Sequence, residues 1–129
     1  MKKIYRLFLL IALLLTLPAC ASQAEPTPSV AQPIQVNLAT VPDPPQVGDV
    51  ELRFTVLDQN GNPLQGASVE AHADHIDMTG MEMSGTATEQ GGGVYAITAN
   101  FSMSGNWKIT VSVRQGELEA QQEFRLVVK

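Results

Sequence analysis

The chain has 129 residues, with 13 acidic residues against 8 basic ones and a single cysteine. This length fits one modest domain with its own core. The acidic balance excludes a nucleic-acid partner, because phosphate neutralisation needs clustered lysine and arginine. The lone cysteine excludes an internal disulfide.

The first twenty residues predict an export signal. Three basic residues precede an apolar run over 7–17, which is shorter than the roughly twenty residues that span a bilayer. The run ends in LPAC, which looks like a bacterial lipobox and closes with Cys20. We therefore predict a lipoprotein signal peptide over 1–19 and an extracytoplasmic domain anchored to the membrane by a lipid on Cys20. The alternative is an uncleaved N-terminal anchor.

Residues 20–33 predict a lipidated, flexible tether, because Ser, Gln, Ala, Glu, Pro and Thr leave little to bury. The rest of the chain, 34–129, is the predicted domain. In the proline-rich segment 41–45, Pro42, Pro44 and Pro45 have no backbone N–H to donate to a ladder, so we expect a loop there.

The domain has a hydrophobic period of two. In VELRFTV (50–56), apolar residues alternate with polar ones, so one face of the strand is buried and the other is wet. Turn signals such as DQNGNP (58–63) separate such runs. The expected strands are 34–38, 50–57, 67–73, 81–88, 93–101, 106–114 and 118–128. They predict an all-β fold: an immunoglobulin-like antiparallel β-sandwich of about seven strands with up-and-down connections.

The segment HADHIDMTGMEM (72–83) is a candidate metal site. It contains both histidines of the chain and three methionines, and these candidate ligands are His72, His75, Met78, Met81 and Met83. Thioether sulfur is a soft ligand and imidazole a borderline one, so the set suits Cu(I) better than Mg²⁺ or Ca²⁺. Successive loops of the expected sandwich alternate between its two ends. Met103, two connections later, therefore joins the same candidate site.

Spacing leaves other interpretations open. His72 and His75 lie three residues apart, so in a continuous strand they would point to opposite faces. Met81 and Met83 share a face if that piece is extended. Methionines near strand ends also serve as flexible plugs of a core, and histidines beside aspartates are commonly solvated.

Nothing in the sequence predicts an enzyme. Ser68, His72 and Asp74 are triad residue types, but neighbouring positions of one strand cannot bring them together as nucleophile, base and orienter. The triple glycine at 91–93 precedes an expected strand, where a phosphate-binding loop would precede a helix.

Several motifs resemble the YtkA-like/FixH-like domain family. They are DQNGNPLQGA (58–67), the Met-x-x-Met-x-Met segment (78–83) and FSMSGNW (101–107), followed by an alternating strand. The resemblance covers about residues 45–115. It implies a small, membrane-attached immunoglobulin-like domain associated with copper or cation handling and with the assembly of respiratory oxidases.

Two functions follow as hypotheses. In the first, an accessory lipoprotein holds Cu(I) as a cofactor at the membrane surface and passes it to a partner, either a copper protein or a respiratory or transport complex. In the second, a metal-free interaction module docks a membrane complex. Replacement of methionine by leucine separates them, because leucine keeps apolar volume but cannot bind a metal.

Overall fold

The computed structural model describes residues 33–129, so the predicted signal peptide, Cys20 and nearly all of the predicted tether lie outside the described residues. Residues 33–129 form seven strands, and no helix in that range could cross a membrane. The strands are β1 (Ile34–Val41), β2 (Gly48–Asp58), β3 (Ser68–His75), β4 (Glu82–Gly91), β5 (Val94–Phe101), β6 (Gly105–Gln115) and β7 (Leu118–Val128). The all-β, seven-strand prediction is confirmed.

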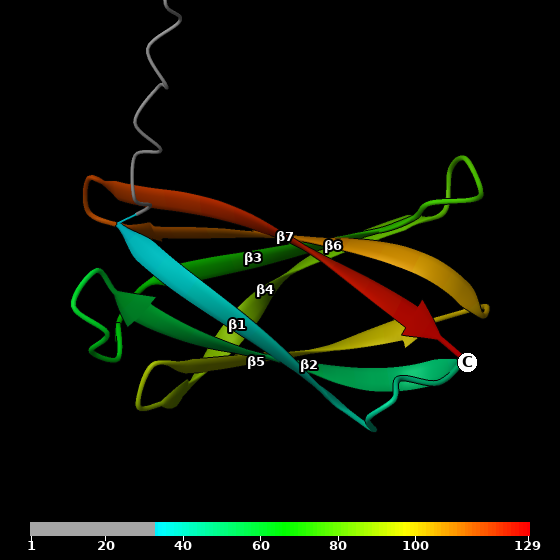
Figure 1. The fold of residues 1–129 in the computed structure, drawn as a ribbon, viewed down its shortest axis with the longest axis horizontal. Coiled ribbons are helices and arrows are strands. Elements are labelled where there is room, and N and C mark those ends of the chain that lie inside the picture. Colours follow the sequence, from blue (N-terminus) through cyan, green and yellow to red (C-terminus); the bar gives the residue numbers. More distant parts are fainter. Residues whose placement is uncertain (1–32) are drawn as a thin grey trace, which may run out of the picture.

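One antiparallel sheet folds into two layers, which Figure 1 shows edge-on. Its strand order is β1-β2-β5-β4-β3-β6-β7. The predicted up-and-down order is wrong, because β2 pairs with β5 and β3 pairs with β6. Every pairing is nevertheless antiparallel, and consecutive strands still alternate in direction. The prediction that loops alternate between the two ends therefore survives the corrected topology.

Strand β4 carries the sheet from one layer to the other. Its first part pairs with β3 from Asp74↔Glu82 to Val69↔Ala87, and its last part pairs with β5 from Thr88↔Ala96 to Gly91↔Val94. Pairing between β4 and β5 thus stops at Thr88↔Ala96, although both strands continue. The two strands diverge beyond that point and leave an opening in the side of the sandwich.

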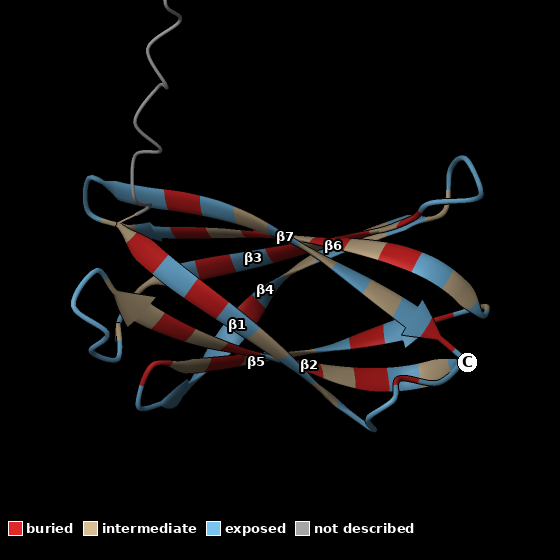
Figure 2. Cartoon of the chain, viewed as in Figure 1, coloured by how far each residue is buried: buried red, intermediate tan, exposed pale blue. Residues whose placement is uncertain are grey.

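The core lies between the layers and is built by alternation. Val50, Leu52, Phe54 and Val56 of β2 are all buried, whereas Arg53 is exposed. Bands of buried and exposed residues alternate in the same way along the other strands in Figure 2. The largest buried side chains are Trp107, Tyr95, Phe54 and Phe101. Burial of apolar surface at about 25 cal/mol per Å² is the main force that holds the layers together.

The turn after β2 forms where the sequence predicts it. One carboxylate oxygen of Asp58 accepts backbone N–H groups of Asn60 and Asn62 at 2.8 and 2.9 Å, and Gly61 takes a positive φ of 82°. The hydrogen bond from the backbone of Asn62 is the largest cause that lowers the pKa of Asp58 below its ordinary value of 3.8.

Three loops gather at one end of the sandwich, which we call the methionine end. They are 42–47, 76–81 and 102–104. Backbone hydrogen bonds connect them to their neighbours: Ile76 N donates to Asn106 O at 2.9 Å, and Val47 N donates to Lys129 O at 2.9 Å. Strand β1 begins at the opposite end of the sandwich (Figure 1).

Candidate metal site at the methionine end

A small cavity opens where β4 leaves the β3–β4 loop. Its volume is about 190 Å³, and it is lined by Gly80, Met81, Glu82, Met83, Asn100, Ser102 and Trp107. Met81 and Met83 lie on one side of the extended chain, as their spacing predicts, and both are half-buried. Two methionines and a tryptophan therefore line one pocket. Glu82 also lines it, but its carboxylate lies on the outer sheet face, 3.6 Å from Nε2 of His72.

Met103 reaches the same end from the opposite loop. Its side chain is half-buried against the core, and its backbone oxygen accepts the indole N–H of Trp107 at 3.3 Å. Trp107 in turn lines the cavity. The structure therefore brings Met81, Met83 and Met103 to one end, around the same tryptophan. Met83 and Met103 also pack against the core, so the interpretation of methionine as a core plug holds for part of each side chain.

His75 is buried, with 5% of its surface exposed, and both of its ring nitrogens are engaged. Nδ1 accepts the backbone N–H of Asp77 at 3.3 Å, so Nε2 carries the proton and donates to Ser104 O at 3.2 Å. The ring also meets Trp107 edge-on, with centroids 4.9 Å apart. His75 therefore ties loop 76–81 to loop 102–104 and has no free lone pair for a metal in this arrangement.

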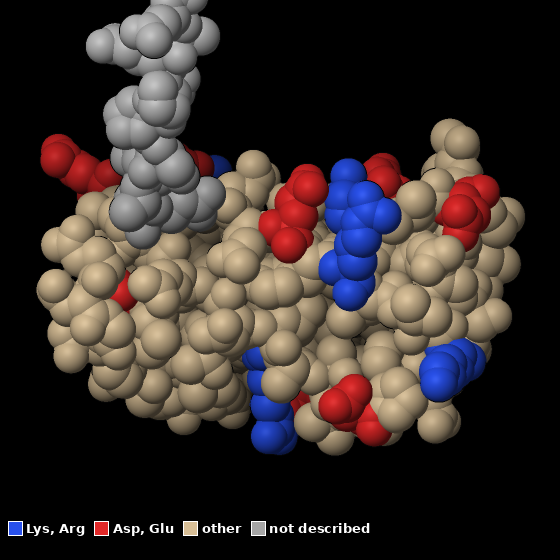
Figure 3. Space-filling view, in the orientation of Figure 1, with Lys and Arg blue, Asp and Glu red and all other residues tan. Residues whose placement is uncertain are grey.

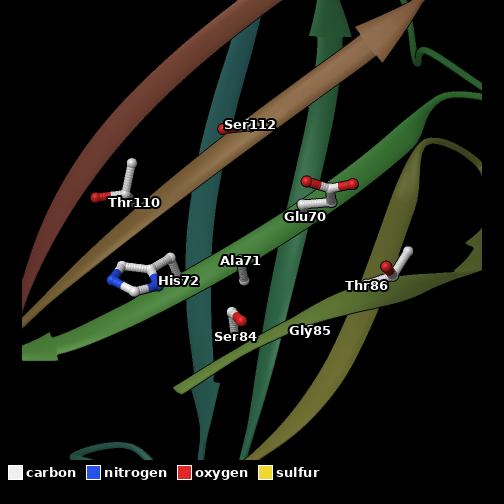
Figure 4. A pocket seen from close by; sticks show the side chains of 8 residues that line it. All are labelled: Glu70, Ala71, His72, Ser84, Gly85, Thr86, Thr110 and Ser112. Carbon is white, nitrogen blue, oxygen red and sulfur yellow. The ribbon is translucent and has the colours of Figure 1, made fainter. Parts of the chain in front are cut away.

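His72 lies on the outer face of β3, away from the methionines. Its Nε2 is 3.6 Å from a carboxylate oxygen of Glu82. Figure 4 shows it in a shallow polar hollow with Glu70 and the hydroxyl groups of Ser84, Thr86, Thr110 and Ser112. The prediction that the two histidines face opposite sides of the strand is confirmed. The structure consequently separates His72 from the other predicted ligands.

Met78 occupies the tip of the β3–β4 turn. Its side chain is 46% exposed, which makes it the most exposed methionine among residues 33–129. Two hydrogen bonds close the turn: Met78 N donates to His75 O at 3.4 Å, and His75 N donates to Met81 O at 3.0 Å. Met78 therefore stands outside the cavity, three residues before Met81.

A second hollow, of about 170 Å³, continues from the first into the opening between β4 and β5. The two share Met83 and Asn100, and the second is otherwise lined mainly by small or apolar side chains, including Ala71, Ala73 and Ala99. Position 85 requires glycine, because an added Cβ would lie 2.6 Å from Cδ1 of Ile97. The methionine cavity is thus the outer part of a wedge that reaches the core.

The charge at the methionine end is acidic. The three loops contain Asp43 and Asp77 and no lysine or arginine. At the strand ends beside them lie Asp49, Asp74 and Glu82 against Lys108, Arg125 and Lys129, so five carboxylates stand against three basic side chains. On the described part of the face in Figure 3, acidic and basic side chains are scattered and form no continuous basic patch. Such a field favours the approach of cations.

Hard or borderline donors do not assemble a site within residues 33–129: no three His, Cys, Asp or Glu side chains there are placed to hold one ion. The methionines Met81 and Met83 do line one cavity, and thioether sulfur is a donor that fits a soft ion such as Cu(I). Trp107 and Asn100 line the cavity but are absent from the predicted ligands. The period-two pattern marks Trp107 only as core, and no local signal marks Asn100, which reaches the cavity from β5.

We compared the chain with known proteins in three ways. The soluble domain of PmoD from Methylocystis sp. (strain Rockwell) is similar in structure, with a TM-score of 0.49 and 14% sequence identity over 74% of this chain and 90% of that one. No curated protein matches the sequence. The sequence profile of the YtkA-like family matches residues 29–112. Because this match covers more than half of the chain and agrees with the motifs above, the protein belongs to the YtkA-like family.

Proposed function

We propose that the protein is an extracytoplasmic copper-handling accessory that binds Cu(I) at the methionine end, between Met81, Met83 and Met103, and passes it to a partner. The role is one of binding and transfer, without catalysis. A lipid on Cys20 would hold the domain at a membrane. The copper ion is the cargo of this protein.

The observation that carries the proposal is the shared cavity. Met81 and Met83 line it together, and Trp107, on its wall, is bonded to the loop that carries Met103. Thioethers need no deprotonation to bind a metal and do not form disulfides, so they suit an oxidising compartment. Each copper–thioether bond is weak enough to be exchanged, which suits transfer. The excess of carboxylates around this end adds a favourable field for a cation.

The proposal uses fewer ligands than the sequence predicts. His75 has both nitrogens in hydrogen bonds, and His72 lies on the outer sheet face. In the proposal, His75 holds the two loops at the correct separation, and His72 takes no part. The coordination sphere is therefore rich in sulfur, with no imidazole.

The test is a competitive Cu(I) titration of the full chain in detergent micelles under anaerobic conditions. All proteins carry Cys20→Ser, because the cysteine thiol would itself bind Cu(I). Trp107 is the single tryptophan of the chain, so its fluorescence reports directly on the cavity. We expect one Cu(I) per chain and a Kd that rises about a hundredfold or more in the double variant Met81→Leu, Met83→Leu.

His72→Gln is the matched control, because it removes a predicted ligand from outside the cavity. Its Kd should equal that of the parent protein. X-ray absorption of the bound copper should show sulfur neighbours without the imidazole signature. Equal affinities for the double leucine variant and the parent protein would refute the proposal, as would a loss of binding in His72→Gln alone.

A metal-free docking module remains the second candidate, because apolar side chains gather on the surface of the same end. Val47, Ile76, Met78 and Val127 are each between 42% and 59% exposed. Exposed apolar side chains of this kind mark interaction surfaces. In this alternative the methionine-to-leucine variants keep full function in the cell, and charged substitutions at Ile76 or Val127 abolish it.

A further inference from the structure

We propose that Met78 is the capture ligand of the copper site: its sulfur is the first protein atom to bond an arriving Cu(I), which it hands to Met81 and Met83, and the donor it fits is a positively charged Cu(I) carrier. This inference rests on the proposed copper site. From its residue type alone, Met78 would be one more ligand that holds the bound copper. We assign it the separate task of first contact.

Exposure separates Met78 from the other methionines of the site. Met78 is 46% exposed at the tip of a turn, whereas Met81, Met83 and Met103 are half-buried. A methionine that served as a core plug would be covered by its neighbours. A resident ligand would also be withdrawn into the cavity. An exposed thioether at a tip can meet a donor before any other sulfur does.

The turn keeps Met78 within reach of the cavity. Three residues span at most about 10 Å, even in a fully extended chain. The hydrogen bonds of His75 with Met78 and Met81 fold this segment back, so the actual separation is shorter. Both side chains are long and unbranched, and Gly80 between them lines the cavity itself. An ion on Met78 can therefore be passed inward without a change of fold.

The surroundings of Met78 form a face suited to contact with a donor. Ile76 is 42% exposed, and its backbone N–H donates to Asn106 O. Asn106 pairs in register with Val127, which is 59% exposed. The side-chain amide of Asn106 donates to a carboxylate oxygen of Asp77 at 3.1 Å. We call Ile76, Asp77, Met78, Asn106 and Val127 the capture face. It combines apolar contact area with a fixed negative charge.

That negative charge decides the class of donor. Asp77 lies on the capture face, and loop 76–81 has no basic residue. In the adjacent row of residues, Asp74 and Glu82 lie in register with Lys108 and Arg125, so with Asp77 three carboxylates stand against two basic side chains. Anionic Cu(I) complexes are repelled by this field and cationic ones are attracted. A donor that is positively charged, whether a small complex or the basic face of a copper protein, is therefore the favoured source.

The transfer is a sequence of ligand substitutions. One donor–copper bond breaks as the bond from Met78 Sδ to copper forms. That bond breaks in turn as the sulfur of Met81 binds, and the remaining donor–copper bonds break as Met83 and Met103 bind, which releases the free donor ligand. Copper stays in the +1 state throughout. Because a thioether carries no proton, neither protons nor electrons move.

A kinetic experiment distinguishes a residue that speeds copper uptake from one that holds the bound ion. The experiment mixes the full chain, with Cys20→Ser in detergent micelles, with a coloured phenanthroline-type Cu(I) complex in a stopped-flow instrument and follows the loss of colour. For Met78→Leu we expect the rate of copper uptake to fall about tenfold while Kd stays within about twofold. The rate of copper release must then fall by the same factor. Thr79→Val, in the same turn, should leave both quantities unchanged.

Two results would overturn the role of Met78. If Met78→Leu takes up copper at the parental rate, capture occurs elsewhere. If its Kd rises by the same factor as its uptake rate falls, Met78 is an ordinary resident ligand. If the equilibrium titration of the parent protein shows no bound Cu(I), the proposed function itself fails, and that outcome is distinct from both of these.

A second experiment tests the class of donor. It compares two Cu(I) complexes that have the same aromatic core and opposite charge. The cationic neocuproine complex should deliver copper faster than the sulfonated, anionic bathocuproine complex at low ionic strength, and salt should remove the difference. Asp77→Asn should weaken the preference, whereas Glu117→Gln, at the opposite end of the sandwich, should not. Equal rates from both donors at low salt would contradict the assignment of a cationic carrier.

Discussion

At the scale of single residues, the segment Met103–Trp107, with the pattern Met-x-Gly-x-Trp, holds the loops of the methionine end together. Trp107 is buried and donates its indole N–H to Met103 O, and His75 packs against its ring. Gly105 has a φ of 131°, and an added Cβ would lie 2.6 Å from Nε2 of His75. Position 105 therefore requires glycine for two reasons: the positive φ of its backbone and the close approach of the His75 ring.

Gly105→Ala should destabilise the domain by at least about 2 kcal/mol, because it combines backbone strain with a clash against a buried ring. Gly116→Ala is the matched control: φ is also positive, at 59°, but no atom lies within 4 Å of the added Cβ. It should cost only about 1 kcal/mol. Urea unfolding of both variants measures the difference. Equal losses would show that His75 moves aside without cost.

At the scale of elements, Tyr95 of β5 fastens the long loop between β2 and β3. Its hydroxyl accepts the backbone N–H of Ala67 at 3.0 Å and donates to Leu64 O at 2.9 Å. Burial is the largest cause that raises the pKa of Tyr95 above 10. The two bonds fix both the exit of the turn that begins at Asp58 and the start of β3.

Tyr95→Phe keeps the ring but removes both partners of the loop backbone. We expect a loss of about 1–3 kcal/mol in the free energy of unfolding, because a partly buried donor and acceptor are left unpaired. The loss is measured by chemical denaturation, with amide exchange at Ala67 as a local reporter. Exchange at Ala67 should accelerate, whereas exchange in β6 should follow only the global change. An unaltered rate at Ala67 would mean that water replaces the hydroxyl fully.

At the scale of the whole molecule, the sequence predicts where the strands lie better than it predicts which strands pair. The expected seventh strand, 118–128, agrees with β7 at both ends, because period-two alternation and glycine turns are local signals. The pairing of β2 with β5 depends on contacts far apart in the chain, which alternation does not encode. The candidate site follows the same rule. The alternation of side chains along an extended chain predicts that Met81 and Met83 face the same side. The hydrogen bond between His75 and Ser104 depends on a tertiary contact, which the sequence pattern does not predict.

The crossing of β4 between layers leads to a last prediction, about protection of the backbone. Most of β3 has hydrogen-bonded neighbours on both sides, β4 and β6. Each part of β4 has a partner on one side only, because its pairing with β5 begins where its pairing with β3 ends. About half of its amides therefore lack a ladder partner, so β4 should exchange hydrogen faster than β3. Amide exchange followed by NMR measures this directly, with β6, which pairs on both sides, as the protected reference. Slow exchange throughout β4 would mean that the opening beside Met83 is closed in solution, and copper would then have to enter by the tip at Met78 alone.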